Sequence, residues 1–242
     1  MFPIKNTVAT RYPPIVNWTL IAANCLVFLY QISLSPAELE RFLGQYALIP
    51  AQYFGGVAEF GDSLDILPFI SNAFLHGGWL HLIFNMWTLW LFGGAVEDRM
   101  GPGRYLAFYL ACAVLASVTH ALFNASSMVP ALGASGAIAG VLGCYMRLFP
   151  LARVVVVIPI LFLPFFFELP AFVFAGLWFL MQFLQGAVEL LTPSSGAGVA
   201  WWAHIGGFVA GLVLGPLLVR SQRHYRLYQA DEGILGFTPS GR

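Results

Sequence analysis

The 42 residues from Tyr105 to Met146, YLAFYLACAVLASVTHALFNASSMVPALGASGAIAGVLGCYM, contain no Asp, Glu, Lys or Arg. A membrane-spanning helix needs about 20 apolar residues, so this stretch is long enough for two spans. Its middle part, FNASSMVP at residues 123–130, is typical of a turn. We therefore predict one span over residues 105–122 and the next over residues 135–149.

The whole chain has the composition of a membrane protein. Of its 242 residues, 59% are apolar and 9% are charged, whereas a soluble domain has about 45–50% and about 25%. A single globular core cannot bury that much apolar surface, so we predict a polytopic membrane protein surrounded by a lipid bilayer. Eleven Lys and Arg balance eleven Asp and Glu, so the chain offers no basic surface for a nucleic-acid partner.

Intervals with at most one charged residue elsewhere in the chain predict four more spans, which gives six in total. These four spans lie at residues 15–33, 73–96, 171–191 and 201–219. We therefore divide the chain into an N-terminal tail (1–14), a six-helix membrane domain (15–219) with an outer loop (34–68), and a C-terminal tail (220–242).

The apolar segment Val154–Phe167 is too short and too rich in proline for a further span, so we interpret it as an interfacial or re-entrant connector. With six spans, ten of the eleven Lys and Arg fall on one side of the membrane, and only Arg41 falls on the other. The positive-inside rule identifies the basic side as cytoplasmic, so we expect both termini there. The compact form of the chain favours the plasma membrane of a bacterium.

Polar side chains inside spans are costly, which makes each of them a candidate for function. His81 and Asn85 lie one helical turn apart in the second span, so both can point at one atom. Ser135 begins the fourth span and His204 lies near the start of the sixth. The orientation inferred from the arginines places all four groups in the outer half of the membrane, which indicates one site.

Small residues on the fourth and sixth spans favour close packing of these two helices. They are Gly136 and Gly140 on the fourth span, and Gly207 and Gly211 on the sixth. Close approach would bring the Ser135 hydroxyl within about 2.6–3.2 Å of the His204 imidazole, as a nucleophile and its base require.

These parts predict a serine protease dyad without metal or cofactor. His204 would accept the Ser135 proton while the hydroxyl attacks a peptide carbonyl. Backbone N–H groups of Gly133 and Ser135 at the helix start, with the side chains of His81 and Asn85, would stabilise the negative charge on the carbonyl oxygen. The H-E-x-x-H motif of zinc proteases is absent from the sequence.

Three segments, HGGWLHLIFN (76–85), GASG (133–136) and AHIGG (203–207), resemble the signatures of rhomboid intramembrane serine proteases. The resemblance implies an all-α bundle of six transmembrane helices, with Ser135 as nucleophile, His204 as base, and His81 and Asn85 as oxyanion contributors. It further implies membrane-spanning protein substrates that are cut near the outer membrane boundary. The fifth span and residues 192–199 would correspond to the family's mobile gate and cap.

Other interpretations stay open from the sequence. One alternative is an inactive rhomboid-like protein that binds or escorts transmembrane helices, although the intact Ser135 and His204 disfavour it. A small-solute transporter is a weaker alternative, since polar residues of the fifth span such as Gln182 are more often helix contacts or cavity lining. Many family members place an aromatic ring against the catalytic histidine where this chain has Ala139, so the sequence does not identify the group that orients His204.

Overall fold

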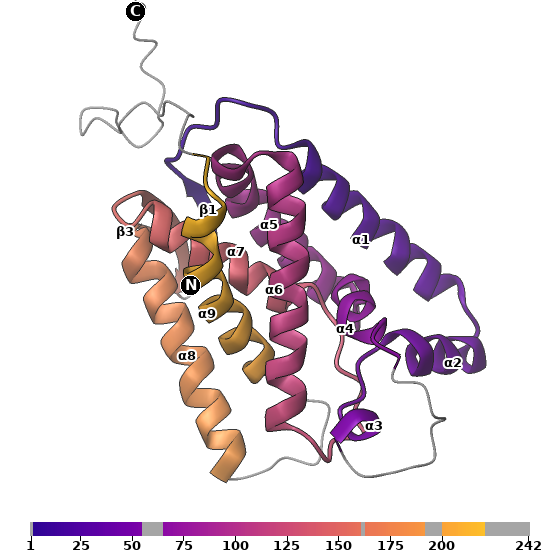
Figure 1. Cartoon of the computed structure of the whole chain (residues 1–242). Coiled ribbons are helices and arrows are strands. Elements are labelled where there is room, and N and C mark those ends of the chain that lie inside the picture. The colour runs from indigo at the N-terminus through magenta and orange to yellow at the C-terminus, as the bar shows by residue number, and fades with distance from the viewer. Residues whose placement is uncertain (1, 55–64, 161–162, 192–199, 221–242) are drawn as a thin grey trace, which may run out of the picture.

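A computed structural model describes residues 2–54, 65–160, 163–191 and 200–220 of the protein, shown in Figure 1. The elements follow one another as β1 (Phe2–Asn6), α1 (Ile15–Ser33), α2 (Pro36–Tyr46), α3 (Ala51–Phe54), α4 (Pro68–Ser71), a 3₁₀ turn (Asn72–Phe74), α5 (Trp79–Met100), α6 (Pro102–Phe123), α7 (Ser135–Leu148), β2 (Arg153–Ile160), β3 (Leu163–Pro170), α8 (Ala171–Leu191) and α9 (Trp201–Leu218).

The predicted helical membrane bundle is confirmed, and the six predicted spans correspond to α1 and α5 to α9. Within the described part of the chain, five helices (α1, α5, α6, α8 and α9) are long and apolar enough to cross a membrane. The sixth, α7, has 14 residues and is about 21 Å long at 1.5 Å per residue. Helix α5 begins at Trp79 rather than near Ala73, because residues 68–74 form α4 and the 3₁₀ turn.

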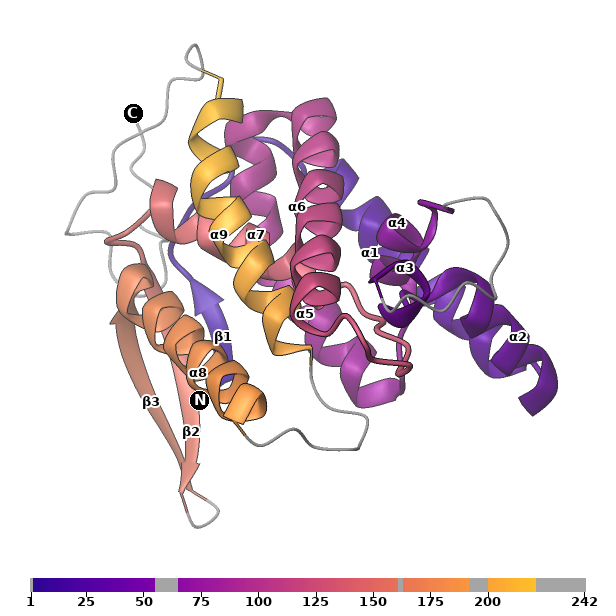
Figure 2. The ribbon, with the colours of Figure 1, turned by 60° about the horizontal axis from the view of Figure 1, so that its bottom comes forward.

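Helix α7 lies inside the bundle, where it packs against α5, α6, α8 and α9 (Figures 1 and 2). Ten of its fourteen residues are buried. A helix enclosed in this way makes few contacts with lipid, so its short length does not leave a hydrophobic mismatch. This arrangement places the first residue of α7, Ser135, in the interior of the bundle.

Helix α1 lies at the periphery and is attached by a stripe of buried polar side chains. The Tyr105 hydroxyl donates to Asn17 Oδ1 at 2.7 Å, and Asn17 Nδ2 donates to the Leu89 carbonyl at 3.1 Å. The Glu97 carboxylate accepts the N–H groups of Val16 (3.0 Å) and Asn17 (2.8 Å). A carboxylate at this position satisfies free N–H groups of the helix start and complements its dipole.

The segment predicted to be an interfacial connector forms a β-hairpin. Strand β2 pairs antiparallel with β3 and with β1 from the N-terminal tail, so the sheet order is β1-β2-β3. The sheet lies beside α8 (Figure 2), with Val154 and Val156 buried. Strand β1 is attached to α5, because the Trp87 indole donates to the Pro3 carbonyl at 2.7 Å. The all-α prediction did not include this sheet.

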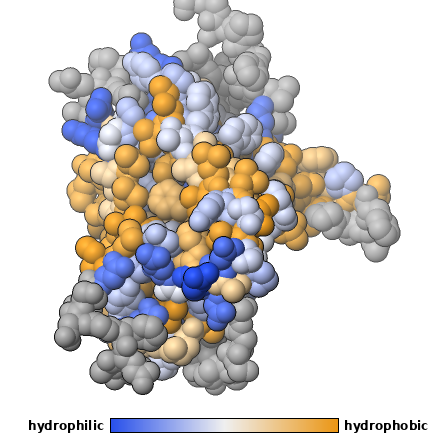
Figure 3. All heavy atoms as spheres, turned by 90° about the vertical axis from the view of Figure 1, so that its right-hand side faces the viewer, coloured by the Kyte–Doolittle hydropathy of each residue, from blue (hydrophilic) through white to orange (hydrophobic). Residues whose placement is uncertain are grey.

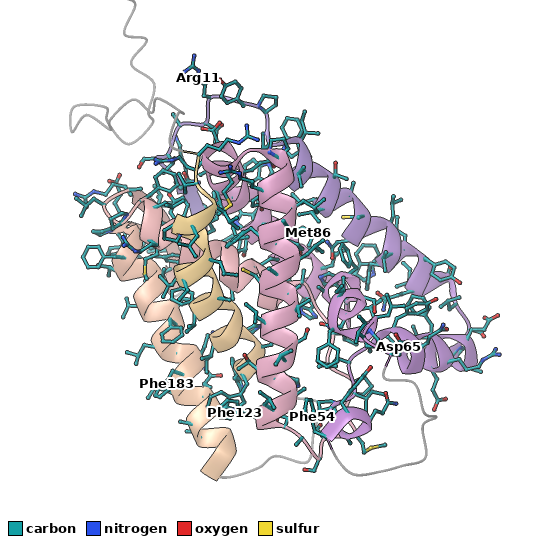
Figure 4. All side chains as sticks on the ribbon, in the orientation of Figure 1. Arg11, Phe54, Asp65, Met86, Phe123 and Phe183 are labelled. Carbon is teal, nitrogen blue, oxygen red and sulfur yellow. The ribbon has the colours of Figure 1, made fainter. Side chains whose placement is uncertain are left out.

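The surface of the bundle has an apolar band between two hydrophilic zones (Figure 3). Arg11 lies at the upper end of the view in Figure 4, while Phe54 and Phe123 lie at the lower end. Segments predicted to share the basic side meet at the upper end: Arg220 N–H donates to the Arg99 carbonyl at 3.1 Å. The bundle therefore has two hydrophilic ends with an apolar band between them.

The outer loop and the 3₁₀ turn after it support the segment that leads into α7. Leu48 and Ala131 exchange backbone hydrogen bonds of 3.1 and 2.7 Å, which form an isolated β-bridge. Asn72, buried at the 3₁₀ turn, donates to Ser117 Oγ at 2.9 Å, and its carbonyl accepts the Gly133 N–H at 2.9 Å. These contacts fix the backbone immediately before Ser135.

Candidate active site

Ser135 and His204 are in direct contact, as the sequence predicts. The distance from Ser135 Oγ to His204 Nε2 is 2.8 Å, within hydrogen-bonding range. Ser135 is the first residue of α7, and His204 lies in the first turn of α9. His204 is 8% exposed and Ser135 is half-buried, so the hydroxyl stays accessible while the imidazole is held inside the bundle.

Glycines of α7 and α9 allow this contact. A Cβ atom on Gly207 would overlap the carbonyl oxygen of Gly136, and one on Gly211 would overlap that of Gly140. Larger side chains at Gly207 or Gly211 would force α7 and α9 apart, whereas a Cβ atom on Gly136 or Gly140 would first meet side chains of α6. Since Gly136 follows Ser135 and Gly207 lies three residues after His204, one of these two close approaches is next to the contact between Ser135 and His204.

Gln182 of α8 contacts the other nitrogen of the His204 ring. The distance from Gln182 Oε1 to His204 Nδ1 is 2.6 Å, and both side chains are buried. The Trp178 ring lies one turn earlier on α8, with its centroid 5.7 Å from that of His204. The sequence identifies Gln182 as a polar residue of the fifth span, but it does not show which way this helix is rotated.

His81 and Asn85 both line the cavity that contains Ser135 and His204. The Asn85 side chain is buried, and its Nδ2 lies 3.1 Å from Nε2 of His76. The His76 and His81 rings meet edge-on with centroids 5.1 Å apart. The His76 ring therefore contacts both Asn85 and His81.

The predicted contribution of Gly133 needs a correction. Its backbone N–H already donates to the Asn72 carbonyl at 2.9 Å, so it is not available to an oxyanion. Instead, Gly133 has φ of +135°, which L-residues with a side chain rarely adopt. A Cβ atom at this position would lie 2.8 Å from His81 Nε2 and 3.5 Å from Ser135 Oγ. The missing side chain thus leaves a space between these two groups.

The dyad opens into a cavity of about 1550 Å³. Its walls come from helices α5 to α9, from the segment before α7, and from Phe2 and Pro3. The cavity is large enough for a peptide segment of several residues, and aromatic residues such as Trp178 and Trp201 make much of it apolar. No cluster of three His, Cys, Asp or Glu suited to a metal ion occurs among the described residues. The predicted cap, residues 192–199, lies outside the described residues.

Comparisons with known proteins match one family over more than half of the chain. Residues 64–221 match the Rhomboid domain family. The chain is 29% identical over 232 residues to Rhomboid protein 1, mitochondrial, of Saccharomyces cerevisiae, which covers 90% of this chain and 58% of the yeast protein.

Two bacterial proteases also match over shorter regions. The chain is 46% identical over 72 residues to Rhomboid protease GluP of Bacillus subtilis, covering 30% of this chain and 14% of that protein. It is 26% identical over 123 residues to Rhomboid protease GlpG of Salmonella choleraesuis, covering 51% of this chain and 40% of that protein. The chain thus spans less than two thirds of the length of these relatives.

Proposed function

The chain belongs to the rhomboid family, and from this premise we propose that it is an intramembrane serine endopeptidase with a Ser135–His204 dyad. The 2.8 Å contact between Ser135 Oγ and His204 Nε2 carries the proposal. Two relatives, GluP and GlpG, are named as proteases. Membrane-spanning proteins are the proposed substrates, and no cofactor is needed for this chemistry.

In the first step, Ser135 Oγ attacks the carbonyl carbon of the scissile peptide bond while His204 Nε2 accepts the hydroxyl proton. The resulting oxyanion would lie in the space that Gly133 leaves open beside His81 Nε2. Asn85 Nδ2 and the N–H of Ser135 at the start of α7 are further donors. His204 then protonates the leaving amine, and a water molecule hydrolyses the acyl-enzyme by the same sequence of proton transfers.

The alternative of an inactive helix-binding protein is tested with a fluorophosphonate probe, which reacts with activated serines. We expect purified wild-type protein to be labelled and Ser135→Ala to remain unlabelled. Wild-type protein should also cleave a single-pass substrate after reconstitution into liposomes, with the cut site read by mass spectrometry. Absence of both labelling and cleavage in folded wild-type protein would contradict the proposal.

The protein is integral to a membrane, and the finer location stays a prediction. Its relatives include mitochondrial and bacterial proteins, and the bacterial plasma membrane remains the location predicted from the sequence. We propose that the tails at 1–14 and 220–242 face the cytoplasm and that the outer loop faces the exterior. The basic residues at one end of the bundle support this orientation.

A further inference from the structure

Helix α8 presents one glutamine to the bundle and another to its surroundings. Gln182 is 7% exposed, whereas Gln185, one turn later, is exposed. The neighbours of Gln182 in sequence, Met181 and Phe183, point outward with exposed fractions of 46% and 47%, and Figure 4 shows Phe183 directed away from the other helices. A buried polar group on a membrane helix has a partner or a function, and the partner of Gln182 is the His204 ring.

The hydrogen bond between these residues selects one protonation form of the imidazole. A neutral imidazole carries its proton on either Nδ1 or Nε2. The Gln182 oxygen can only accept a hydrogen bond, so its 2.6 Å contact with Nδ1 requires the Nδ1–H form. In that form Nε2 has a free electron pair, and this pair faces Ser135 Oγ at 2.8 Å. The other form would place a proton on Nε2 and could not accept the serine proton.

We propose that Gln182 is a positioning residue that holds His204 in the form able to activate Ser135. Two hydrogen bonds connect the three side chains: Gln182 Oε1 contacts His204 Nδ1, and His204 Nε2 contacts Ser135 Oγ. Gln182 lies on α8, His204 on α9 and Ser135 on α7. Gln182 carries no charge and takes no proton. It supplies the orienting contact that the sequence alone left unassigned. The expected effect of Gln182 on kcat rests on the proposed function. The hydrogen bond between Gln182 and His204 does not depend on that function.

The same oxygen also favours the charged imidazolium that forms during the attack. The imidazolium donates from both nitrogens, and a hydrogen bond to a charged group is stronger than one between neutral groups. Removal of the acceptor should therefore reduce kcat, because the loss is larger in the transition state than in the ground state. We expect a decrease of roughly 10- to 100-fold in kcat for Gln182→Met, with KM close to that of wild type.

The experiment compares the full chain with Gln182→Met, Gln182→Glu and the matched control Gln185→Met. Methionine keeps the length and approximate volume of glutamine but removes the acceptor, and glutamate keeps an acceptor oxygen in either protonation state. Cleavage of the single-pass substrate gives kcat and KM. Side-chain ¹⁵N shifts of ¹⁵N-histidine-labelled protein show which ring nitrogen of His204 carries the proton, with the signal assigned by comparison with His204→Ala.

The proposal expects the Nδ1–H form in wild type, Gln182→Glu and Gln185→Met, and its loss together with reduced kcat in Gln182→Met. Wild-type kcat and an unchanged His204 signal in Gln182→Met would overturn it, as would an Nε2–H form in wild type. If Gln182→Met fails to fold, the Glu variant decides: a lost Nδ1–H signal in folded Gln182→Glu overturns the proposal. A wild-type protein that is not labelled at Ser135 but shows a Gln182-dependent Nδ1–H signal would refute the proposed function alone.

Discussion

Gly207 of α9 lies directly against the backbone carbonyl oxygen of Gly136 on α7, at the level where Ser135 meets His204. The contact has no room for a side chain. Both helices enter the site from the same end of the bundle, so their separation sets the distance between the nucleophile and its base.

We predict that Gly207→Ala separates the dyad. The added Cβ would overlap the Gly136 oxygen, and overpacking of this kind costs about 1–3 kcal/mol of stability. The matched control is Gly176→Ala on α8, where a Cβ would meet no atom within 4 Å. Thermal unfolding in detergent should show a lower Tm for Gly207→Ala, together with slower fluorophosphonate labelling of Ser135. Equal Tm and labelling in the two variants would contradict the role of this contact.

Gly133→Ala should abolish cleavage while leaving the dyad in place. The new methyl group would fill the space 2.8 Å from His81 Nε2 where we place the oxyanion, and the positive φ adds strain of about 1–3 kcal/mol. We expect kcat, measured by cleavage, to fall by a larger factor than the fraction of folded protein, measured by thermal unfolding. Cleavage at the wild-type rate would show that the oxyanion lies elsewhere.

Asn85→Ala should lower kcat by about 10²–10³, the usual loss for one oxyanion donor. The Asn85 amide lies 3.1 Å from His76 Nε2, which limits its motion before substrate arrives. His76→Ala should therefore reduce kcat less than Asn85→Ala, because the amide remains present but less ordered. Single-turnover cleavage by folded protein measures the rate for each variant. If Asn85 and His76 were purely structural, the decrease in rate would follow the decrease in Tm.

The sequence predicts the contact between Ser135 and His204 because its signals are local or additive. His81 and Asn85 share a helix face by their spacing, and the glycines mark where α7 and α9 meet. The rotation of α8 about its own axis is different: it depends on packing against several helices, so the contact between Gln182 and His204 is visible only in the structure. The hydrogen bond of the Gly133 N–H is likewise not predictable from neighbouring residues, because its acceptor, the Asn72 carbonyl, belongs to a turn about 60 residues earlier.

The sheet is the largest feature that the sequence analysis missed. Its β-branched run begins at Val154, but the strand that completes it comes from the N-terminal tail, more than 140 residues away. Pairing over this separation leaves no periodic signal in either segment. Hydrophobic patterns alone therefore identify the apolar hairpin segment as a membrane-surface connector and leave β1 as a tail.

A disulfide test examines the pairing of β1 with β2. Lys5 and Val155 are antiparallel partners, and opposite residues of such strands have Cα atoms about 4.5–5.5 Å apart, which suits a disulfide. Lys5→Cys/Val155→Cys should therefore cross-link under mild oxidation. Glu168 pairs with Val155 from the far side, so the control Lys5→Cys/Glu168→Cys spans about 9–10 Å and should remain reduced. Equal cross-linking of the two pairs, read by mass spectrometry, would contradict this register.

The proposed orientation predicts on which side of the membrane each end of α1 lies. Arg11 lies before α1, at the upper end of the bundle in Figure 4, and Glu40 is exposed on α2, after α1. A membrane-impermeant maleimide added to intact cells should label Glu40→Cys, and it should label Arg11→Cys only after permeabilisation. The unmodified protein, with its three native cysteines, provides the background. Reversed labelling would contradict the orientation inferred from the basic residues but not the fold, whereas labelling of both positions from one side would contradict α1 as a span.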